Sequence, residues 1–293
     1  MTEVVLNEGL SQISLLSIYV AMALYSAAFL LYTSSLAKLV SANDKSAAEK
    51  PSKLEKAALV ITILAALVHG AAVVLRGIAA ARVPWANMYE FSISSALLIL
   101  LVYLTSLKIK DVRFIATFVT GFVLVTLFAA VSLFYVEVKT LMPALQSYWL
   151  VIHVVVAILA TSFFAIAAGL HIAYLVKSSN IAKRLMELFP ALEQLERLAY
   201  RFNVVGFVLW SFTLIAGAIW AERAWHRYWG WDTKEVWTFI IWTIYAGYLH
   251  AMATRGWNGK RAAWLGLVAF SAIIFNFTIV NLYFKGLHVY SGL

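Results

Sequence analysis

The residues best suited to chemistry in this sequence are a cluster of tryptophans and six histidines. Five of the eleven tryptophans fall within residues 220–237, which read Trp-Ala-Glu-Arg-Ala-Trp-His-Arg-Tyr-Trp-Gly-Trp-Asp-Thr-Lys-Glu-Val-Trp. Indole faces suit a large planar ligand because they bury much apolar area with little loss of entropy. Neutral imidazoles are common ligands for metals and for heme iron. Cysteine is absent, so thiol catalysis, thiolate metal sites and disulfides within the chain are excluded.

The elements that must position these residues are membrane-spanning helices. Hydrophobic residues make up 63% of the 293 positions and charged residues 13%, with a mean hydropathy of +0.85. This leaves too few polar groups to cover a soluble surface. The apolar residues form continuous runs of about twenty, which suit helices that cross a bilayer and exclude the alternating strands of a barrel. We therefore predict an all-α, polytopic membrane protein that forms one integral membrane domain, with eight spans at residues 14–37, 57–80, 90–107, 114–135, 148–176, 203–222, 236–254 and 262–284.

Lysine and arginine counts in the connections predict the orientation of the spans. Seven of the 23 basic residues lie on one face, and sixteen lie on the other, in residues 38–56, 108–113, 177–201 and 255–261. Because cytoplasmic loops carry the excess of positive charge, we place the more basic face in the cytoplasm and both termini outside a bacterial cell membrane. The same excess explains the net charge of +9 without any nucleic-acid partner. The first apolar stretch lacks the basic flank and cleavage site of a signal peptide, so we count it as a span.

Residues 181–202 have the pattern of an amphipathic helix. Leucine and isoleucine recur at spacings of three and four between charged residues, and Pro190 predicts a break or bend. We predict that this helix lies along the cytoplasmic surface of the membrane. It either positions the neighbouring spans or offers a docking surface to a partner.

The tryptophan-rich residues 220–237 fall in the outer connection between spans six and seven. An interfacial aromatic belt is the alternative, but a belt would spread its tryptophans over many helix ends. We therefore interpret this stretch as an outward-facing aromatic shelf for a planar ligand. On a helical turn, Trp225, Trp229 and Asp232 would share one face. Asp232 and Glu235 also suit the N-terminus of span seven electrostatically.

This stretch resembles a known signature. The run Trp-Gly-Trp-Asp-x-Lys-Glu, which begins at Trp229 and follows spaced tryptophans, is similar to the "WWD" signature of heme-handling proteins in cytochrome c biogenesis. From about the second span to the C-terminus the sequence resembles the CcsA/ResC family, called CcsB in some bacteria, with CcmC a more distant relative. Residues 84–90, Pro-Trp-Ala-Asn-Met-Tyr-Glu, also fit the pattern. Thr233 stands where the family usually has proline, and His226 stands where glycine is common, which leaves the role of His226 open.

Two histidines flank the tryptophan-rich loop on the predicted outer face. His153 lies near the outer start of span five, and His288 lies just beyond the outer end of span eight. Two imidazoles on either side of an aromatic shelf describe a bis-histidine site for heme b. The resemblance implies that outer histidines at these two places are heme ligands. We assign heme binding on the shelf itself to Trp225, Trp229, Trp231, Asp232 and Trp237.

His250 lies in the inner half of span seven, where an ionisable residue is costly and usually functional. The resemblance implies a second heme position within the membrane, with His250 as one ligand and the opposite ligand supplied by a partner membrane protein. His69, near the middle of span two, either fills that role or is a buried polar contact. We interpret His171 and the exposed His226 as residues without a ligand role.

Arg76, Arg82 and Glu90 are charged groups close to the predicted outer face. They either snorkel and cap helix ends, or one arginine pairs with a heme propionate through two parallel hydrogen bonds.

The resemblance implies a heme-handling, heme-export subunit of a cytochrome c synthetase, which presents heme on the outer face for thioether attachment to apocytochrome c. We assign no catalytic residue, because no base or nucleophile is evident, so the chain fits a subunit of such a complex better than a complete enzyme. The implied partners are a ResB-like membrane protein and a thioredoxin-like thiol reductant. The alternatives are a cytochrome b-type electron-transfer subunit, which would show facing pairs of histidines, and a transporter, which would show broken helices and a buried charge at the midplane.

Overall fold

The computed structural model describes residues 6–42, 50–140, 145–254, 257–284 and 286–287. Within these residues the secondary structure is helical, without a strand. Eight helical segments are long and apolar enough to cross a membrane. The prediction of an all-α protein with eight spans is therefore confirmed. His288, one of the predicted ligands, lies outside the described residues.

The spans follow one another through short connections. They begin with α1 (Glu8–Ala42), α2 (Lys53–Ala79) and α3 (Met88–Ile109), and a short 3-10 turn (Arg113–Ile115) then leads into α4 (Ala116–Leu133). The chain continues with α5 (Tyr148–Ser178), the short α6 (Lys183–Met186), α7 (Leu192–Trp225), α8 (Thr233–Ala253) and α9 (Lys260–Phe275). The last span runs from α9 through a π-helical turn (Asn276–Val280) into α10 (Asn281–Tyr283).

Polar side chains mark where several of these helices begin. Ser52, Asn87 and Ser147 each accept a hydrogen bond from a backbone N–H in the first turn of α2, α3 and α5. Such caps satisfy N–H groups that have no partner within the helix. Beyond the caps the apolar runs stay helical, because in a bilayer each backbone polar group must be bonded inside the segment.

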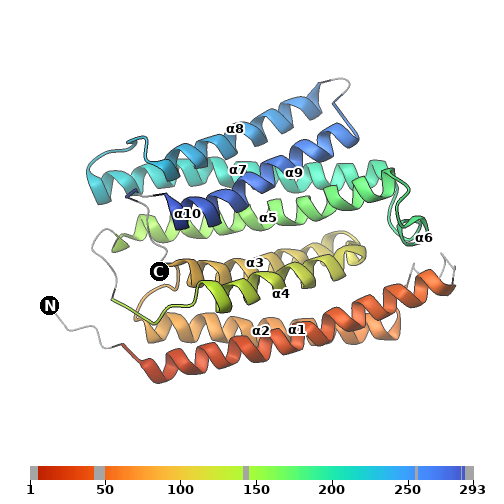
Figure 1. The fold of residues 1–293 in the computed structure, drawn as a ribbon, viewed down its shortest axis with the longest axis horizontal. Coiled ribbons are helices and arrows are strands. Elements are labelled where there is room, and N and C mark those ends of the chain that lie inside the picture. Colours follow the sequence, from red (N-terminus) through yellow and green to blue (C-terminus); the bar gives the residue numbers. More distant parts are fainter. Residues whose placement is uncertain (1–5, 43–49, 141–144, 255–256, 285, 288–293) are drawn as a thin grey trace.

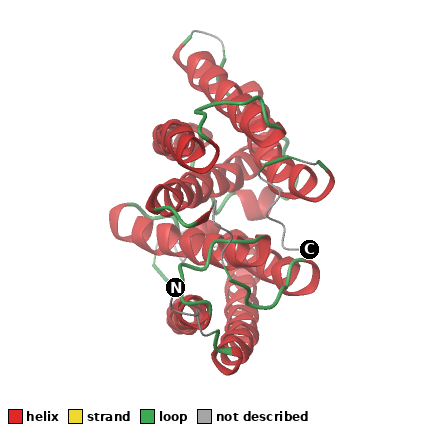
Figure 2. Cartoon of the chain, turned by 90° about the vertical axis from the view of Figure 1, so that its left-hand side faces the viewer, coloured by secondary structure: helices red, strands yellow, loops and turns green. Residues whose placement is uncertain are grey.

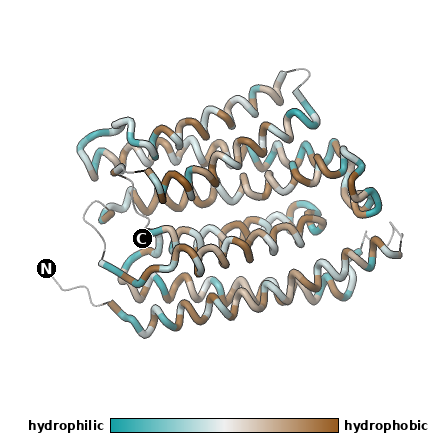
Figure 3. Tube along the Cα trace, in the orientation of Figure 1, coloured by the Kyte–Doolittle hydropathy of each residue, from teal (hydrophilic) through white to brown (hydrophobic). Residues whose placement is uncertain are grey.

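Helices that are neighbours in the sequence pack against one another. The most extensive helix–helix interfaces join α1 to α2 and α5 to α7. In Figure 1, α1 and α2 form one edge of the bundle and α8 forms the opposite edge, with α3, α4, α5 and α9 between them. Figure 2 views the same helices from one end of the bundle. Figure 3 shows that hydrophilic residues gather mainly at the two ends, in the loops and around α6.

The connections alternate between the two ends of the bundle. The start of α1, the end of α10 and residues 226–232 lie at the left in Figure 1, which we call the loop end, and α6 lies at the opposite end. The four connections with the excess of basic residues join helices at the α6 end. The arrangement thus segregates charge as the sequence predicts. That the α6 end faces the cytoplasm stays a prediction.

The segment 181–202, predicted as an amphipathic surface helix broken or bent near Pro190, is interrupted there but does not form a separate surface helix. Residues 187–191, around Pro190, are not helical, and they separate the short α6 from the beginning of α7. Proline lacks an N–H and its ring clashes with the preceding turn, which accounts for the break. Leu195 and Leu198 are buried against the other spans. The apolar stripe therefore packs onto the bundle, and the second half of the segment is the first part of a membrane span.

Candidate functional site

Residues 226–232 connect α7 to α8, and we call them the tryptophan loop. His226 and Trp231 have left-handed backbones, with φ of 54° and 60°. His226 ends α7, and its N–H donates to the carbonyl of Glu222 at 2.8 Å. A left-handed position at the end of a helix favours glycine. This gives a physical reason for the glycine that is common at this place in the family that the sequence resembles.

Glu235 and Asp232 fix the far end of the tryptophan loop. The Oε2 atom of Glu235 accepts hydrogen bonds from the N–H groups of Gly230 at 2.8 Å and Asp232 at 3.0 Å. Asp232 caps α8 with its side chain, and its Oδ1 atom also accepts a hydrogen bond from the Leu287 N–H at 3.0 Å. Both acids therefore bind backbone N–H groups. Asp232 ties the tryptophan loop to the residue that immediately precedes His288.

A cavity of about 550 Å³ lies beneath the tryptophan loop. It is bordered by α3 and α4 on one side and by α5, α7, α8 and α9 on the other. Its volume falls in the range of sites for small molecules and cofactors, and its walls are mainly apolar, as is usual for such sites. The aromatic side chains on these walls include Trp85, Phe91, Trp210, Trp220, Trp229 and Phe277.

The structure separates the five clustered tryptophans by position. The buried Trp220 and the 37% exposed Trp229 border the cavity, whereas Trp231 is 76% exposed. Trp225 packs edge-on against Trp220, with ring centroids 4.8 Å apart, and Trp237 packs within the bundle. Because α7 ends at Trp225, the helical face predicted to run through Trp225 and Trp229 does not form. The cavity is walled by two of the five indoles instead of one continuous shelf.

His153 borders the same cavity from α5. Its Nδ1 atom lies 3.0 Å from the backbone carbonyl oxygen of Thr213 on α7. A carbonyl oxygen can only accept a hydrogen bond, so Nδ1 carries the proton and Nε2 carries the lone pair. Histidines that bind metals commonly donate their other ring N–H to a carbonyl or carboxylate in this way. The contact with Thr213 therefore favours the tautomer of His153 in which Nε2 can bind a metal.

The packing of α5 against α7 fixes the orientation of this imidazole. The ring lies nearly parallel to the indole of Trp220, with centroids 6.0 Å apart and planes at 16°. The imidazole also contacts Gly217 of α7, where an added Cβ would lie 2.8 Å from Cε1 of His153. The absence of a side chain at Gly217 thus lets the imidazole approach the α7 backbone. Sequence reasoning did not identify Thr213 or Gly217, because small residues in an apolar span carry no signal of what they contact.

Polar groups gather where the cavity meets the start of α8. The Nζ atom of Lys234 donates to the carbonyl of Asn276 and to Oδ1 of Asn281, both at 2.8 Å. Asn276 opens the π-helical turn, a feature that is frequent at functional sites. Oε1 of Glu235 and Oδ1 of Asn276 are buried and have no hydrogen-bond partner within the described residues, and both residues border the cavity. Buried acceptors left in this state are typical where a ligand or water binds.

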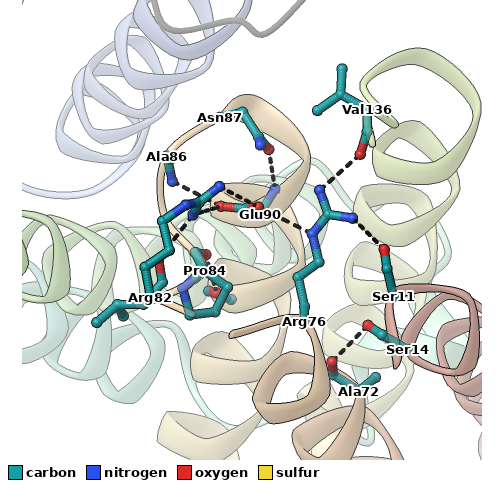
Figure 4. A network of polar contacts seen from close by, with 12 residues as sticks. Ser11, Ser14, Ala72, Arg76, Arg82, Pro84, Ala86, Asn87, Glu90 and Val136 are labelled. Atoms are coloured by element: carbon teal, nitrogen blue, oxygen red, sulfur yellow. Dashed lines mark hydrogen bonds and ion pairs between the residues drawn. The ribbon is translucent and has the colours of Figure 1, made fainter. Parts of the chain in front are cut away.

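Arg76, Arg82 and Glu90 form a buried network beside the cavity (Figure 4). Both Arg82 terminal nitrogens donate to the two carboxylate oxygens of Glu90, at 2.6 and 3.1 Å. Arg76 donates from Nε to Glu90 at 3.1 Å and from its terminal nitrogens to Ser11 Oγ and the Val136 carbonyl. Neither arginine borders the cavity. The geometry therefore favours the structural interpretation of these charges over pairing with a ligand carboxylate.

The two histidines considered for a second site lie far apart. His69 is fully buried on α2, with Nδ1 3.3 Å from the Tyr25 hydroxyl on α1. His250 is exposed on α8, which lies at the opposite edge of the bundle from α2 (Figure 1). One chain therefore does not bring His69 and His250 together. His171 is buried, with Nε2 3.0 Å from Nδ2 of Asn203, as befits an internal polar contact.

The described residues thus form a multi-pass helical membrane protein with an aromatic cavity and a tautomerically fixed imidazole beneath a tryptophan-rich loop. Residues 85–288 match the family described as Cytochrome C assembly protein. The chain belongs to this family, and its match includes the loop, the cavity walls on α5 to α9 and His153. The predicted resemblance to CcsA proteins is confirmed.

Individual relatives agree with this assignment. The chain is 38% identical over 179 residues to the cytochrome c biogenesis protein CcsA of a strain of Prochlorococcus marinus, which covers 52% of this chain and 57% of that protein. It is 32% identical over 213 residues to CcsA of Chlamydomonas reinhardtii, covering 71% and 60%. It is 34% identical over 248 residues to CcsA of a strain of Heterosigma akashiwo, covering 72% and 77%. The chain spans somewhat more than half the length of the first of these proteins.

Proposed function

We propose that this protein holds heme b in the cavity beneath the tryptophan loop and presents it for thioether attachment to apocytochrome c. The family supports a role in cytochrome c assembly. The observation that carries the proposal is the hydrogen bond from His153 Nδ1 to the Thr213 carbonyl. Because Nδ1 donates this bond, the lone pair is on Nε2, the nitrogen that would bind iron. The cavity at this ring has a suitable volume and polarity for the cofactor.

The residues of this chain would bind and orient the heme. His153 would bind the heme iron, together with His288, which follows the segment tied to Asp232. Trp220 and Trp229 would pack against the macrocycle from the cavity wall. The bound heme would supply the vinyl groups that react with the thiols of apocytochrome c. Release would follow when a histidine of the acceptor displaces one of the two ligands.

The chain would act together with other proteins. An exposed His250 on α8 supports a second heme position whose opposite ligand comes from a ResB-like membrane partner. A thioredoxin-like protein would keep the acceptor thiols reduced. We place the loop end outside a bacterial cell membrane, because the connections at the α6 end carry the excess of basic residues. The cytochrome b-type alternative would need His171 as a heme ligand. It receives no support, because Nε2 of His171 is hydrogen-bonded to Asn203.

Heme titration of the purified full-length chain tests the proposal. We expect a low-spin spectrum typical of two imidazole ligands, which His153→Ala should lose and which added imidazole should restore. His226→Gly is the matched control, because it removes a histidine at the same end of the bundle at a left-handed position where glycine is unstrained. Equal spectra for wild type and His153→Ala would overturn the ligand assignment. An assay of cytochrome c maturation in cells then tests whether the bound heme is used.

A further inference from the structure

The cavity beneath the tryptophan loop also opens at the side of the bundle. Val125 and Leu133 of α4 and Ile274 of α9 border the cavity, yet their side chains are 67%, 63% and 40% exposed. Residues that are both on a cavity wall and on the surface mark the edge of an opening. All three lie within spans, in the segments Arg113–Leu133 and Lys260–Tyr283. The opening therefore faces the lipid bilayer, and we call it the side window.

Two pairs of phenylalanines bound the side window along the helices. Phe122 of α4 contacts Phe270 of α9 with ring centroids 6.1 Å apart, and Phe134 at the end of α4 contacts Phe277 with centroids 6.0 Å apart. Seven residues separate the two phenylalanines on the α9 side, or about 10 Å of helix, and twelve residues or about 18 Å separate them on the α4 side. Residues of α5, among them Ala157 and Thr161, border the same cavity, so α5 forms part of its wall.

The chemistry of the side window suits contact with lipid. Its two threonine hydroxyls are bonded within their own helices: Thr126 donates to the Phe122 carbonyl at 2.8 Å, and Thr278 donates to the Ile274 carbonyl at 2.7 Å. An opening in the hydrocarbon region is tolerated when its polar groups are satisfied in this way. The charged groups of the cavity, Lys234 and Glu235, instead lie near the tryptophan loop. The cavity is thus apolar toward the bilayer and polar toward the loop end.

We propose that the side window is the route by which heme passes between the lipid bilayer and the cavity. The proposal rests on the proposed function, since it concerns the same cavity and ligand. A planar apolar molecule that dissolves in the membrane reaches the cavity without crossing water, and its carboxylates stay toward the polar loop end. The loop end, where Tyr228 and Trp229 border the cavity and are exposed, is then left for the protein acceptor.

Single-cysteine labelling tests this route, because the chain has no cysteine of its own. Val125→Cys places a thiol at the side window. Phe128→Cys is the matched control, since Phe128 lies on the same helix and is 62% exposed but does not border the cavity. Each full-length variant is reconstituted into phosphatidylethanolamine–phosphatidylglycerol vesicles and labelled with a bulky, membrane-permeant maleimide. Stopped-flow absorbance then follows heme transfer from, and back to, heme-loaded vesicles of the same lipids.

We expect the label at Val125→Cys to slow heme uptake and release by a similar factor, at least tenfold, with the amount bound at equilibrium unchanged. The label at Phe128→Cys should change neither rate. Unchanged rates at both positions would overturn the route. So would a lower equilibrium occupancy with an unchanged uptake rate, which would make Val125 part of the binding site and not of an entrance. A Val125→Cys thiol that cannot be labelled while the Phe128→Cys thiol can would also overturn it, by showing that the window is closed in the membrane.

Failure of the unlabelled protein to take up any heme would overturn the proposed function, and the route with it. By contrast, normal uptake with both labels in place would leave the heme site standing and remove only the side window. A second pair of variants, Ile274→Trp at the window and Val268→Trp elsewhere on the exposed face of α9, should repeat the kinetic difference without chemical labelling.

Discussion

Replacing Gly217 with alanine should weaken heme binding by displacing the imidazole of His153. The new Cβ would lie 2.8 Å from Cε1 and 2.9 Å from Nδ1 of that ring, whereas carbon atoms in good contact are about 3.5–4.0 Å apart. The ring must therefore retreat by about 0.7 Å or more. That movement stretches the 3.0 Å hydrogen bond from Nδ1 to the Thr213 carbonyl. It also turns Nε2 away from the direction in which it would bind the heme iron.

The expected loss follows from what such supporting contacts contribute at metal sites. Changing the partner of a ligating histidine commonly costs about 10- to 100-fold in affinity, or about 1.4–2.7 kcal/mol. A loss of helix stability cannot account for it, because alanine favours a helix interior over glycine by about 1 kcal/mol. We therefore expect the Gly217→Ala protein to keep the wild-type fold and to bind heme more weakly.

Heme titration followed by the Soret band measures this difference. Gly247→Ala is the control, since a Cβ at Gly247 on α8 would meet nothing within 4 Å. It gains the same helix propensity without the clash and should bind heme as wild type does. Equal heme affinity for Gly217→Ala and Gly247→Ala would refute the argument that α5–α7 packing positions the ligand.

Three further outcomes follow from the described contacts. Glu90→Ala should lower the free energy of unfolding by about 3–5 kcal/mol, because it leaves two buried arginines without their carboxylate. The control Asp111→Ala, at an exposed ion pair, should cost less than about 1 kcal/mol. Thermal unfolding in detergent compares the two variants, and equal shifts would contradict the network's role. Trp229→Ala should reduce heme occupancy more than Trp231→Ala, since only Trp229 borders the cavity, and bound heme per protein measures it. A topology reporter fused after Leu293 should be active only outside the cell, and cytoplasmic activity would invert the predicted orientation.

The helices could be predicted from the sequence because the signal is local. A run of about twenty apolar residues is sufficient to identify a span, and each of the eight predicted runs overlaps one of the eight helices that are long and apolar enough to cross a membrane. The ends were less predictable: α7 begins at Leu192, eleven residues before the predicted residue 203, because its first turns are amphipathic and pack on the bundle. Pro190 gave the break correctly, but nothing local told a surface helix from the start of a span.

The site was predictable where residue type alone carries the chemistry. Histidine and tryptophan stand out against an apolar background, so the sequence singles out His153 and Trp229, which the structure places at one cavity. Thr213 and Gly217 were not, because they act through a backbone carbonyl and through the lack of a side chain, and both effects exist only once α5 meets α7. The roles of the charged residues likewise depend on tertiary contacts, as Arg76 shows by its pairing with Glu90 instead of a ligand.

The way in which the structure holds His153, one of the two proposed heme ligands, bears on how heme could be handed over. His153 sits between two long packed helices, where Trp220 and the Thr213 carbonyl fix its ring. The segment that precedes His288 is connected to the tryptophan loop through a hydrogen bond from the Leu287 N–H to Asp232. Exchange of His153 would disturb the packing of α5 against α7, so we expect His153 to stay bound and an acceptor to replace the other proposed ligand, His288.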